Sequence, residues 1–169
     1  MKLLVIRHAF AGDREEFART GLPDSLRPLT DEGRKKMQGA ARGLHRLVPE
    51  LDVLAASPLT RAVQTAEVVA ARYDGMETAT VAELAPEEAP DALVPWLRTH
   101  AADATVAVVG HEPHLGFLAG WLLTGRNVSF LEPKKGGAFL LEFEGESAAG
   151  GAKLRWALTP RQLRDLGRK

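Results

Sequence analysis

Apolar residues along the chain follow two patterns, one typical of buried strands and one typical of amphipathic helices. Short apolar runs at residues 3–6, 52–56 and 105–109 predict strands that are covered on both faces, and a weaker run at residues 78–81 predicts another. Helical spacing of apolar residues predicts helices at residues 31–47, 59–72, 91–97 and 115–123. Strands and helices therefore alternate, as they do in α/β proteins with a largely parallel sheet.

The helix predicted at residues 31–47 has the clearest boundaries. Thr30 is a suitable N-cap residue, and Asp31 and Glu32 lie in the first turn, where negative charge stabilises a helix. The residues expected to face the core are Met37, Ala40, Ala41, Leu44 and Leu47.

The end of the chain follows a different pattern. Strands at residues 138–143 and 153–158 flank a turn rich in Gly, Ala and Ser, which predicts an antiparallel hairpin before a last short helix at residues 161–166. We therefore predict an α/β fold with three layers, α/β/α, in which a mostly parallel central sheet is completed by a late antiparallel hairpin. No repeat, linker or low-complexity segment divides the chain, so we expect residues 1–169 to form a single domain.

One segment has no regular pattern. Residues 9–28 contain Gly12, Gly21, Pro23 and Pro28 among many charged residues, and we expect a long loop there. Loops of this length within a compact domain are usually functional or mobile.

Composition narrows the classes of function. The 169 residues include 22 Lys and Arg and 22 Asp and Glu, and this zero net charge argues against general binding to nucleic acids or membrane surfaces. The absence of cysteine excludes disulfides, thiolate nucleophiles and Cys-ligated metals. No apolar stretch is long enough to span a membrane, and the first residues do not resemble a signal peptide. We expect a cytoplasmic monomer that binds neither nucleic acid nor membranes.

Candidate chemistry lies where three of the predicted strands end. Arg7 and His8 follow the first strand, Ser57 and Arg61 follow the second, and His111 follows the strand at residues 105–109. The carboxyl ends of parallel strands meet at one edge of a sheet, where ligands bind. Two guanidinium groups and two imidazoles repel one another there, so the edge favours an anion, and planar guanidinium groups match phosphate oxygens. The set indicates phosphoryl transfer, in which positioning and charge neutralisation dominate.

Six segments spread over most of the chain match one family. They are residues 4–9 (LVIRHA), 25–30 (SLRPLT), 56–62 (ASPLTRA), 64–66 (QTA), 83–86 (ELAP) and 109–113 (VGHEP). With these segments the chain resembles the histidine phosphatase superfamily, whose hallmark is an Arg–His pair at the end of the first strand, and especially its SixA-like branch of phosphohistidine phosphatases. The resemblance implies a phosphoglycerate mutase-like fold. Ala9 stands where glycine is common in the superfamily, and the SixA-like branch resembles this chain in accepting alanine.

The resemblance also implies roles for individual residues. His8 would be the nucleophile that carries a transient phosphohistidine, and Arg7, Arg61 and His111 would hold the phosphoryl oxygens. Nearby arginines should lower the pKa of His8 and favour the neutral imidazole that attack requires. Arg27 would be a further contact to phosphate or substrate. We expect no metal ion and no cofactor, and we expect the pocket to accept phosphate or sulfate.

Several assignments have alternatives. Salt pairing with Asp24 or Asp31 is the alternative for Arg27. Glu83 is a candidate catalytic proton donor because many family members use a carboxylate near this position. Asp13 is a second candidate, and a phosphoramidate leaving group can also carry its own proton.

The histidines also suggest a different hypothesis, in which His8, His111 and His114 bind a metal ion. Flanking Arg7 and Arg61 would oppose a cation, so we do not favour it. We expect His114 at the pocket rim or on a helix surface.

The resulting expectation is a metal-independent phosphatase that acts on phosphohistidine in a protein. The alternatives are a phosphatase for small phosphate monoesters and, in a different class, a non-catalytic phosphoprotein-binding module on the same fold. The segment between residues 72 and 105 is too short for a second lid domain, so an open pocket would admit a protein loop as well as a small phosphate ester.

Overall fold

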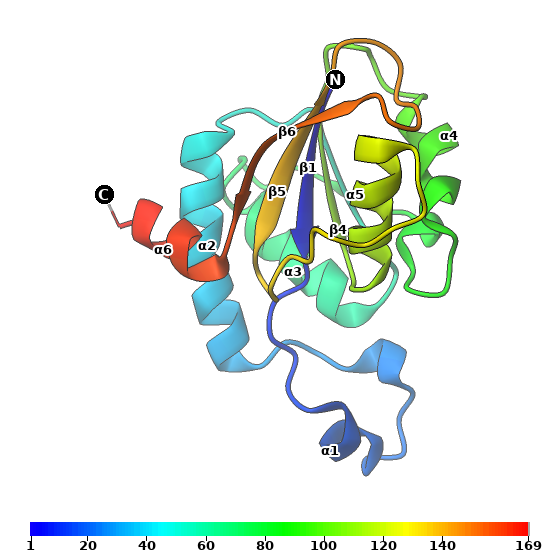
Figure 1. The fold of residues 1–169 in the computed structure, drawn as a ribbon. Coiled ribbons are helices and arrows are strands. Elements are labelled where there is room, and N and C mark those ends of the chain that lie inside the picture. Colours follow the sequence, from blue (N-terminus) through cyan, green and yellow to red (C-terminus); the bar gives the residue numbers. More distant parts are fainter. Residues whose placement is uncertain (169) are drawn as a thin grey trace.

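One six-stranded sheet runs through the computed structural model, which describes residues 1–168 (Figure 1). The strand order is β3-β2-β4-β1-β5-β6. The parallel strands are β1 (Lys2–Arg7), β2 (Val53–Ala56), β3 (Thr78–Thr80) and β4 (Thr105–Gly110). The antiparallel hairpin beside β1 consists of β5 (Ala138–Phe143) and β6 (Ala152–Leu158). The predicted mostly parallel α/β sheet with a late hairpin is confirmed.

Helices cover both faces of the sheet and complete the three layers. The first face is covered by α2 (Asp31–Leu47), α3 (Thr60–Ala70) and α6 (Pro160–Leu166), and the second by α4 (Leu93–Leu97) and α5 (His114–Thr124). Successive residues of β1 alternate between the two cores: Leu4 and Ile6 face the first, and Leu3 and Val5 face the second. This alternation explains why the strand reads as a continuous apolar run.

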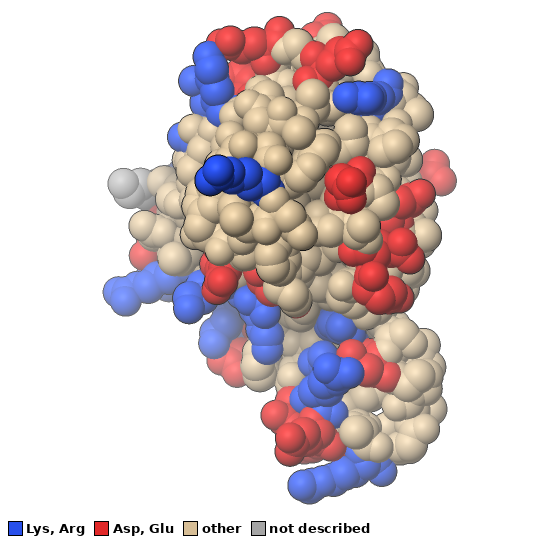
Figure 2. Space-filling view, turned by 45° about the vertical axis from the view of Figure 1, so that its right-hand side comes forward, with Lys and Arg blue, Asp and Glu red and all other residues tan. Residues whose placement is uncertain are grey.

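The segment between β1 and α2 projects away from the sheet and carries charges of both signs (Figures 1 and 2). The predicted uninterrupted loop is wrong, because this segment contains α1 (Arg14–Ala18) and a 3₁₀ turn, Asp24–Leu26. Asp13 caps α1 by accepting the backbone N–H of Glu16 at 2.8 Å. Neither short helix buries a residue, so neither produces an apolar period that would predict it from the sequence.

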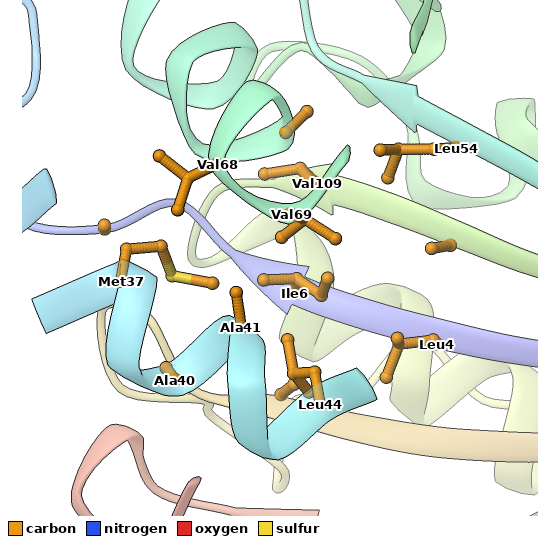
Figure 3. Packing of buried hydrophobic residues seen from close by; sticks show 14 of the residues in the cluster. Leu4, Ile6, Met37, Ala40, Ala41, Leu44, Leu54, Val68, Val69 and Val109 are labelled. Carbon is orange, nitrogen blue, oxygen red and sulfur yellow. The ribbon is translucent and has the colours of Figure 1, made fainter. Parts of the chain in front are cut away.

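The core of the first face is visible in Figure 3, where α2 and α3 pack onto β1, β2 and β4. Met37, Ala40, Ala41 and Leu44 of α2 are buried as predicted. Leu47 was also expected inside, but it is 37% exposed, because the C-cap residue Val48 is the one that enters the core.

The predicted helix boundaries agree closely with the structure. Thr30 caps α2 by accepting the N–H of Gly33 at 3.0 Å, and Thr159 forms a capping box with Gln162 at the start of α6. Among residues 1–168, no helix has both the length and the apolar character needed to cross a membrane.

Candidate active site

The strand ends that were predicted to converge do so. The register of β1 and β4 pairs Arg7 with Gly110, and the N–H of His8 donates to the carbonyl of Gly110 at 3.0 Å. On the other side of β4, the N–H of Ser57 donates to the carbonyl of Val109, also at 3.0 Å. These backbone bonds place the segments after β1, β2 and β4 side by side at one edge of the sheet.

His8 is buried at this edge and has a defined tautomer. Its Nδ1 lies 2.7 Å from the carbonyl oxygen of Ala9, and because a carbonyl only accepts, Nδ1 carries the proton and Nε2 has the lone pair. Burial lowers the pKa of His8 to about 3, with further contributions from Arg61, Arg7 and Lys135. The predicted lowering of this pKa is confirmed, although burial rather than the arginines is its largest cause.

His111 lies beside His8, with 5.1 Å between the ring centroids. Its Nε2 lies 2.8 Å from the hydroxyl of Ser57, which in turn accepts the N–H of Leu59 at 3.4 Å. The Ser57 hydroxyl can donate to Nε2 or accept from it, so this contact orients the His111 ring. The Nδ1 of His111 is buried and has no partner within residues 1–168. Burial and the neighbouring His8 and Arg61 lower the pKa of His111 to about 2.

The two arginines each keep one buried donor free of protein partners within residues 1–168. Arg7 Nη1 donates to the carbonyl of Pro133 at 3.0 Å, and Arg61 Nη1 donates to the carbonyl of Asp24 at 3.0 Å. In both side chains Nε is buried and unpaired among the described residues. Because buried donors are nearly always paired, these unpaired guanidinium donors indicate a site for an anion.

Asp24 joins the arginines that surround this anion site. Its carboxylate accepts from Arg27 Nε at 2.8 Å and lies 3.3 Å from Arg61 Nη1 and 3.8 Å from Arg14 Nε. Arg27 is 8% exposed and also donates to the carbonyl of Gly12 at 3.1 Å. The hydrogen bond from Arg27 lowers the pKa of Asp24. Arg27 thus makes the ion pair with Asp24 that the sequence offered as its alternative, at the border of the candidate site.

The two carboxylates considered as proton donors are not bonded to this group among the described residues. Glu83 lies in the 3₁₀ turn Ala82–Leu84 after β3, and Asp13 caps α1. Among the described residues, no hydrogen bond or ion pair joins either side chain to Arg7, His8, Arg61 or His111.

The expected exposure of His114 is wrong. It is 2% exposed in the first turn of α5, and burial lowers its pKa, while the nearby backbone carbonyls of Ala89 and Glu83 oppose that shift. The 3₁₀ turn Pro90–Ala92, which follows Ala89, packs against α5. Within residues 1–168, no three His, Asp or Glu side chains cluster in a way that could hold a metal ion.

Lys135 and Glu112 adjoin the site, although neither is among the catalytic or substrate-binding residues predicted from the sequence. Burial and the charges of Arg7, Arg27 and Arg61 lower the pKa of Lys135, so its ammonium group lies near all three guanidinium groups. Burial raises the pKa of Glu112 to about 7, against the opposing charge of Arg7. The position of Glu112 directly after His111 was the available sequence signal.

The same neighbourhood contains a backbone contact that fixes the end of β1. The N–H of Gly136 lies 3.1 Å from the carbonyls of both Arg7 and His8. Gly136 has φ of +77°, a conformation in which a side chain would be strained. This turn places Lys135 close to His8. The Gly136–Gly137 pair marks the turn in the sequence.

Comparison with known proteins agrees with this geometry. The model of the histidine phosphatase superfamily (branch 1) matches residues 3–88. An uncharacterized protein of Picosynechococcus sp. is 37% identical over 139 residues, which are 81% of this chain and 82% of that protein. Phosphohistidine phosphatase SixA of Escherichia coli K12 is 26% identical over 170 residues, 97% of both chains. The structure of the protein histidine phosphatase SixA complexed with tungstate matches with a TM-score of 0.77 and 26% identity, covering 96% of this chain and 99% of that one.

The α/β fold, the Arg7–His8 pair at the end of β1 and the matched residues 3–88 place the chain in the histidine phosphatase superfamily. Its similarity to SixA over nearly the full length of both chains assigns it to the SixA-like branch. The protein is a phosphatase.

Proposed function

We propose that this phosphatase removes phosphate from phosphohistidine in a protein, through a covalent intermediate on His8. The observation that carries the proposal is the state of His8. Its imidazole is neutral, its Nδ1–H is engaged by the Ala9 carbonyl, and Nε2 is therefore the nitrogen available for attack. The similarity to SixA supports phosphohistidine as the substrate class.

In the first step, Nε2 of His8 attacks the phosphorus of the substrate. A bond forms between Nε2 and phosphorus while the bond from phosphorus to the substrate's imidazole nitrogen breaks. That nitrogen keeps the electron pair of the broken bond. When the other ring nitrogen of the phosphoimidazole is protonated, the substrate imidazole leaves as a neutral ring that retains this proton. This route requires no protein carboxylate at the leaving group.

In the second step, water attacks the phosphorus on His8, the bond to Nε2 breaks, and inorganic phosphate leaves. Negative charge on the phosphoryl oxygens would be held by Arg7, Arg61 and His111. Each of these side chains has a buried nitrogen, Nε in the arginines and Nδ1 in the histidine, without a partner within residues 1–168. Arg27 would contact the phosphate or the substrate. Positioned donors of this kind contribute most of the rate in phosphoryl transfer.

The covalent step is tested by rapid quench with a labelled aryl phosphate. We expect the wild-type protein to acquire acid-labile, alkali-stable label, as a phosphohistidine does, and His8→Ala to acquire none. Turnover without any trapped label at the shortest times would contradict the covalent route.

The substrate class is tested in one screen with one protein preparation. A chemically phosphorylated phosphohistidine protein, an aryl phosphate and a series of metabolite phosphates are compared by kcat/KM. The proposal predicts the highest value for the phosphohistidine protein. A metabolite phosphate hydrolysed at least tenfold more efficiently would instead identify a small-molecule phosphatase, which the shared phosphate donors would serve equally well.

A further inference from the structure

A recess lies beside the phosphate-binding group, defined here as Arg7, Arg61 and His111, and is not explained by the chemistry at phosphorus. It encloses about 270 Å³ and adjoins Ala9, the residue after the nucleophile. Its floor and walls are apolar, with contributions from Phe10, Met37 and Pro160. This volume accommodates one or two side chains and is smaller than the usual site for a cofactor or a drug-sized ligand.

Three cationic side chains line the same recess: Lys36 from α2, Lys135 from the turn after Glu132, and Arg164 from α6. Lys36 is paired with Glu32 at 2.5 Å. Within residues 1–168, neither Lys135 nor Arg164 has a carboxylate within 4.0 Å. The recess is therefore an apolar surface with two cations available for an acidic group.

Lys135 connects the recess to the phosphate-binding group. It lines the recess, its Nζ lies 5.1 Å from the centre of the Phe10 ring, and its pKa is lowered by burial and by the three arginines of the candidate site. A ligand held in the recess would therefore lie next to a phosphoryl group on His8, as a neighbouring part of the same substrate would.

The positive surface continues past Arg164. The adjoining hollow between α2 and α6 is lined by Lys35, Arg42 and Arg168, with Glu32 as the acidic residue among its lining. In Figure 2, Lys and Arg side chains gather at the lower left of the main body, near the projecting segment. A local basic surface thus lies beside the site although the net charge of the chain is zero.

We propose that this recess binds an acidic residue, together with an apolar neighbour, of the phosphoprotein substrate, within a few residues of the phosphohistidine. The inference rests on the proposed function, because it specifies which phosphohistidine proteins are preferred. Charge complementarity selects an acidic segment, and the apolar walls select an aliphatic or aromatic residue beside it.

The test uses phosphohistidine peptides in which glutamate replaces alanine at each of the four positions on either side of the phosphohistidine, with a leucine adjacent to each glutamate. We expect wild-type kcat/KM to rise at least fivefold for glutamate at one or two positions. The gain should disappear at 0.5 M salt, because the two charges are partly exposed.

Arg164→Gln and Arg164→Glu should reduce this preference to less than twofold, and Arg164→Lys should retain it. Arg161→Gln is the matched control, because Arg161 lies on the same helix, faces Asp165 and does not line the recess. Melting temperatures of all variants establish that they fold. Retention of the preference in Arg164→Glu, or its absence from the wild type at every position, would overturn the inference.

The two proposals fail in different ways. If the peptides are hydrolysed without any preference for glutamate, the recess has no such role and the proposed function stands. If aryl phosphate is hydrolysed and no phosphohistidine peptide is, both the proposed function and the inference are wrong.

Discussion

The candidate site has two halves that are built by different means. His8 and His111 stand at the ends of central strands, are 5% and 2% exposed, and are aligned by backbone hydrogen bonds of the sheet. Arg27 belongs to the projecting segment between β1 and α2, in which neither α1 nor the 3₁₀ turn buries a residue. The strand-end half is rigid because the sheet itself defines it. The segment half depends on the ion pairs that Asp24 makes.

This difference predicts a ranking of effects. Substitutions at the strand ends should abolish chemistry, whereas substitutions in the projecting segment should weaken substrate binding. Arg61 belongs to both halves, since it is carried by α3 behind the strand end and is held by Asp24.

The largest effect is expected for His8→Ala, because it removes the attacking nitrogen. Loss of a nucleophile typically costs at least ~10³-fold in kcat. Steady-state hydrolysis of an aryl phosphate measures this loss of kcat. The control is His45→Ala in the last turn of α2, where the imidazole packs against Tyr73. Residual activity within tenfold of wild type would exclude His8 as the nucleophile.

Arg61→Ala should have the next largest effect. Removing one donor to a developing oxyanion costs about 10²–10³-fold in kcat. The loss should be the same factor for aryl phosphate and for phosphohistidine protein, since both place phosphate in one pocket. A loss for one substrate alone would mean that Arg61 contacts the leaving group instead.

Asp24→Asn tests the segment half. The asparagine keeps the shape but loses the charge that orders Arg27 and Arg61, and ordering two such side chains costs about 1 kcal/mol in entropy. We therefore expect KM for aryl phosphate to rise about fivefold, with a smaller change in kcat. The control is Asp165→Asn, which breaks exposed ion pairs on α6. A fall in KM would show that the carboxylate mainly repels phosphate.

The smallest effect is expected at Glu112, whose pKa is raised to about 7 by burial. Because the folded state holds this proton more tightly than the unfolded chain, the stabilisation is present at pH 4.5 and is lost as the pH rises towards 7 and above. Glu112→Gln should abolish this pH-dependent loss of stability, because glutamine does not ionise. After allowance for the half-exposed carboxyl, the gain at pH 8 is about 1 kcal/mol, or roughly 2–4 °C in Tm.

Thermal unfolding of wild type and Glu112→Gln at pH 5 and pH 8 measures the difference. The two proteins should differ less at pH 5 than at pH 8. An equal difference at both values would mean that Glu112 is ionised throughout this range.

The segment half also shows the limit of sequence patterns. Arg27 was recognised through the SLRPLT segment, but Asp24 entered only as a salt-pair candidate for Arg27, and its contacts to Arg61 and Arg14 were not foreseen. Such contacts join residues 37 and 10 positions apart across an irregular segment. Periodicity carries no information about them, because only the path of the chain brings these side chains together.

Sequence by itself determined the strands of the sheet, the helices that pack on it, their order along the chain, and the edge at which Arg7, His8, Arg61 and His111 meet. These follow from local rules: apolar period, helix caps, and the convergence of parallel strand ends. The tertiary structure decided the rest. It set the tautomer of His8 through one carbonyl, buried His114, and brought Lys135 and Arg164 together beside the nucleophile. Those outcomes depend on distances between residues far apart in the chain, and such distances exist only after the layers pack.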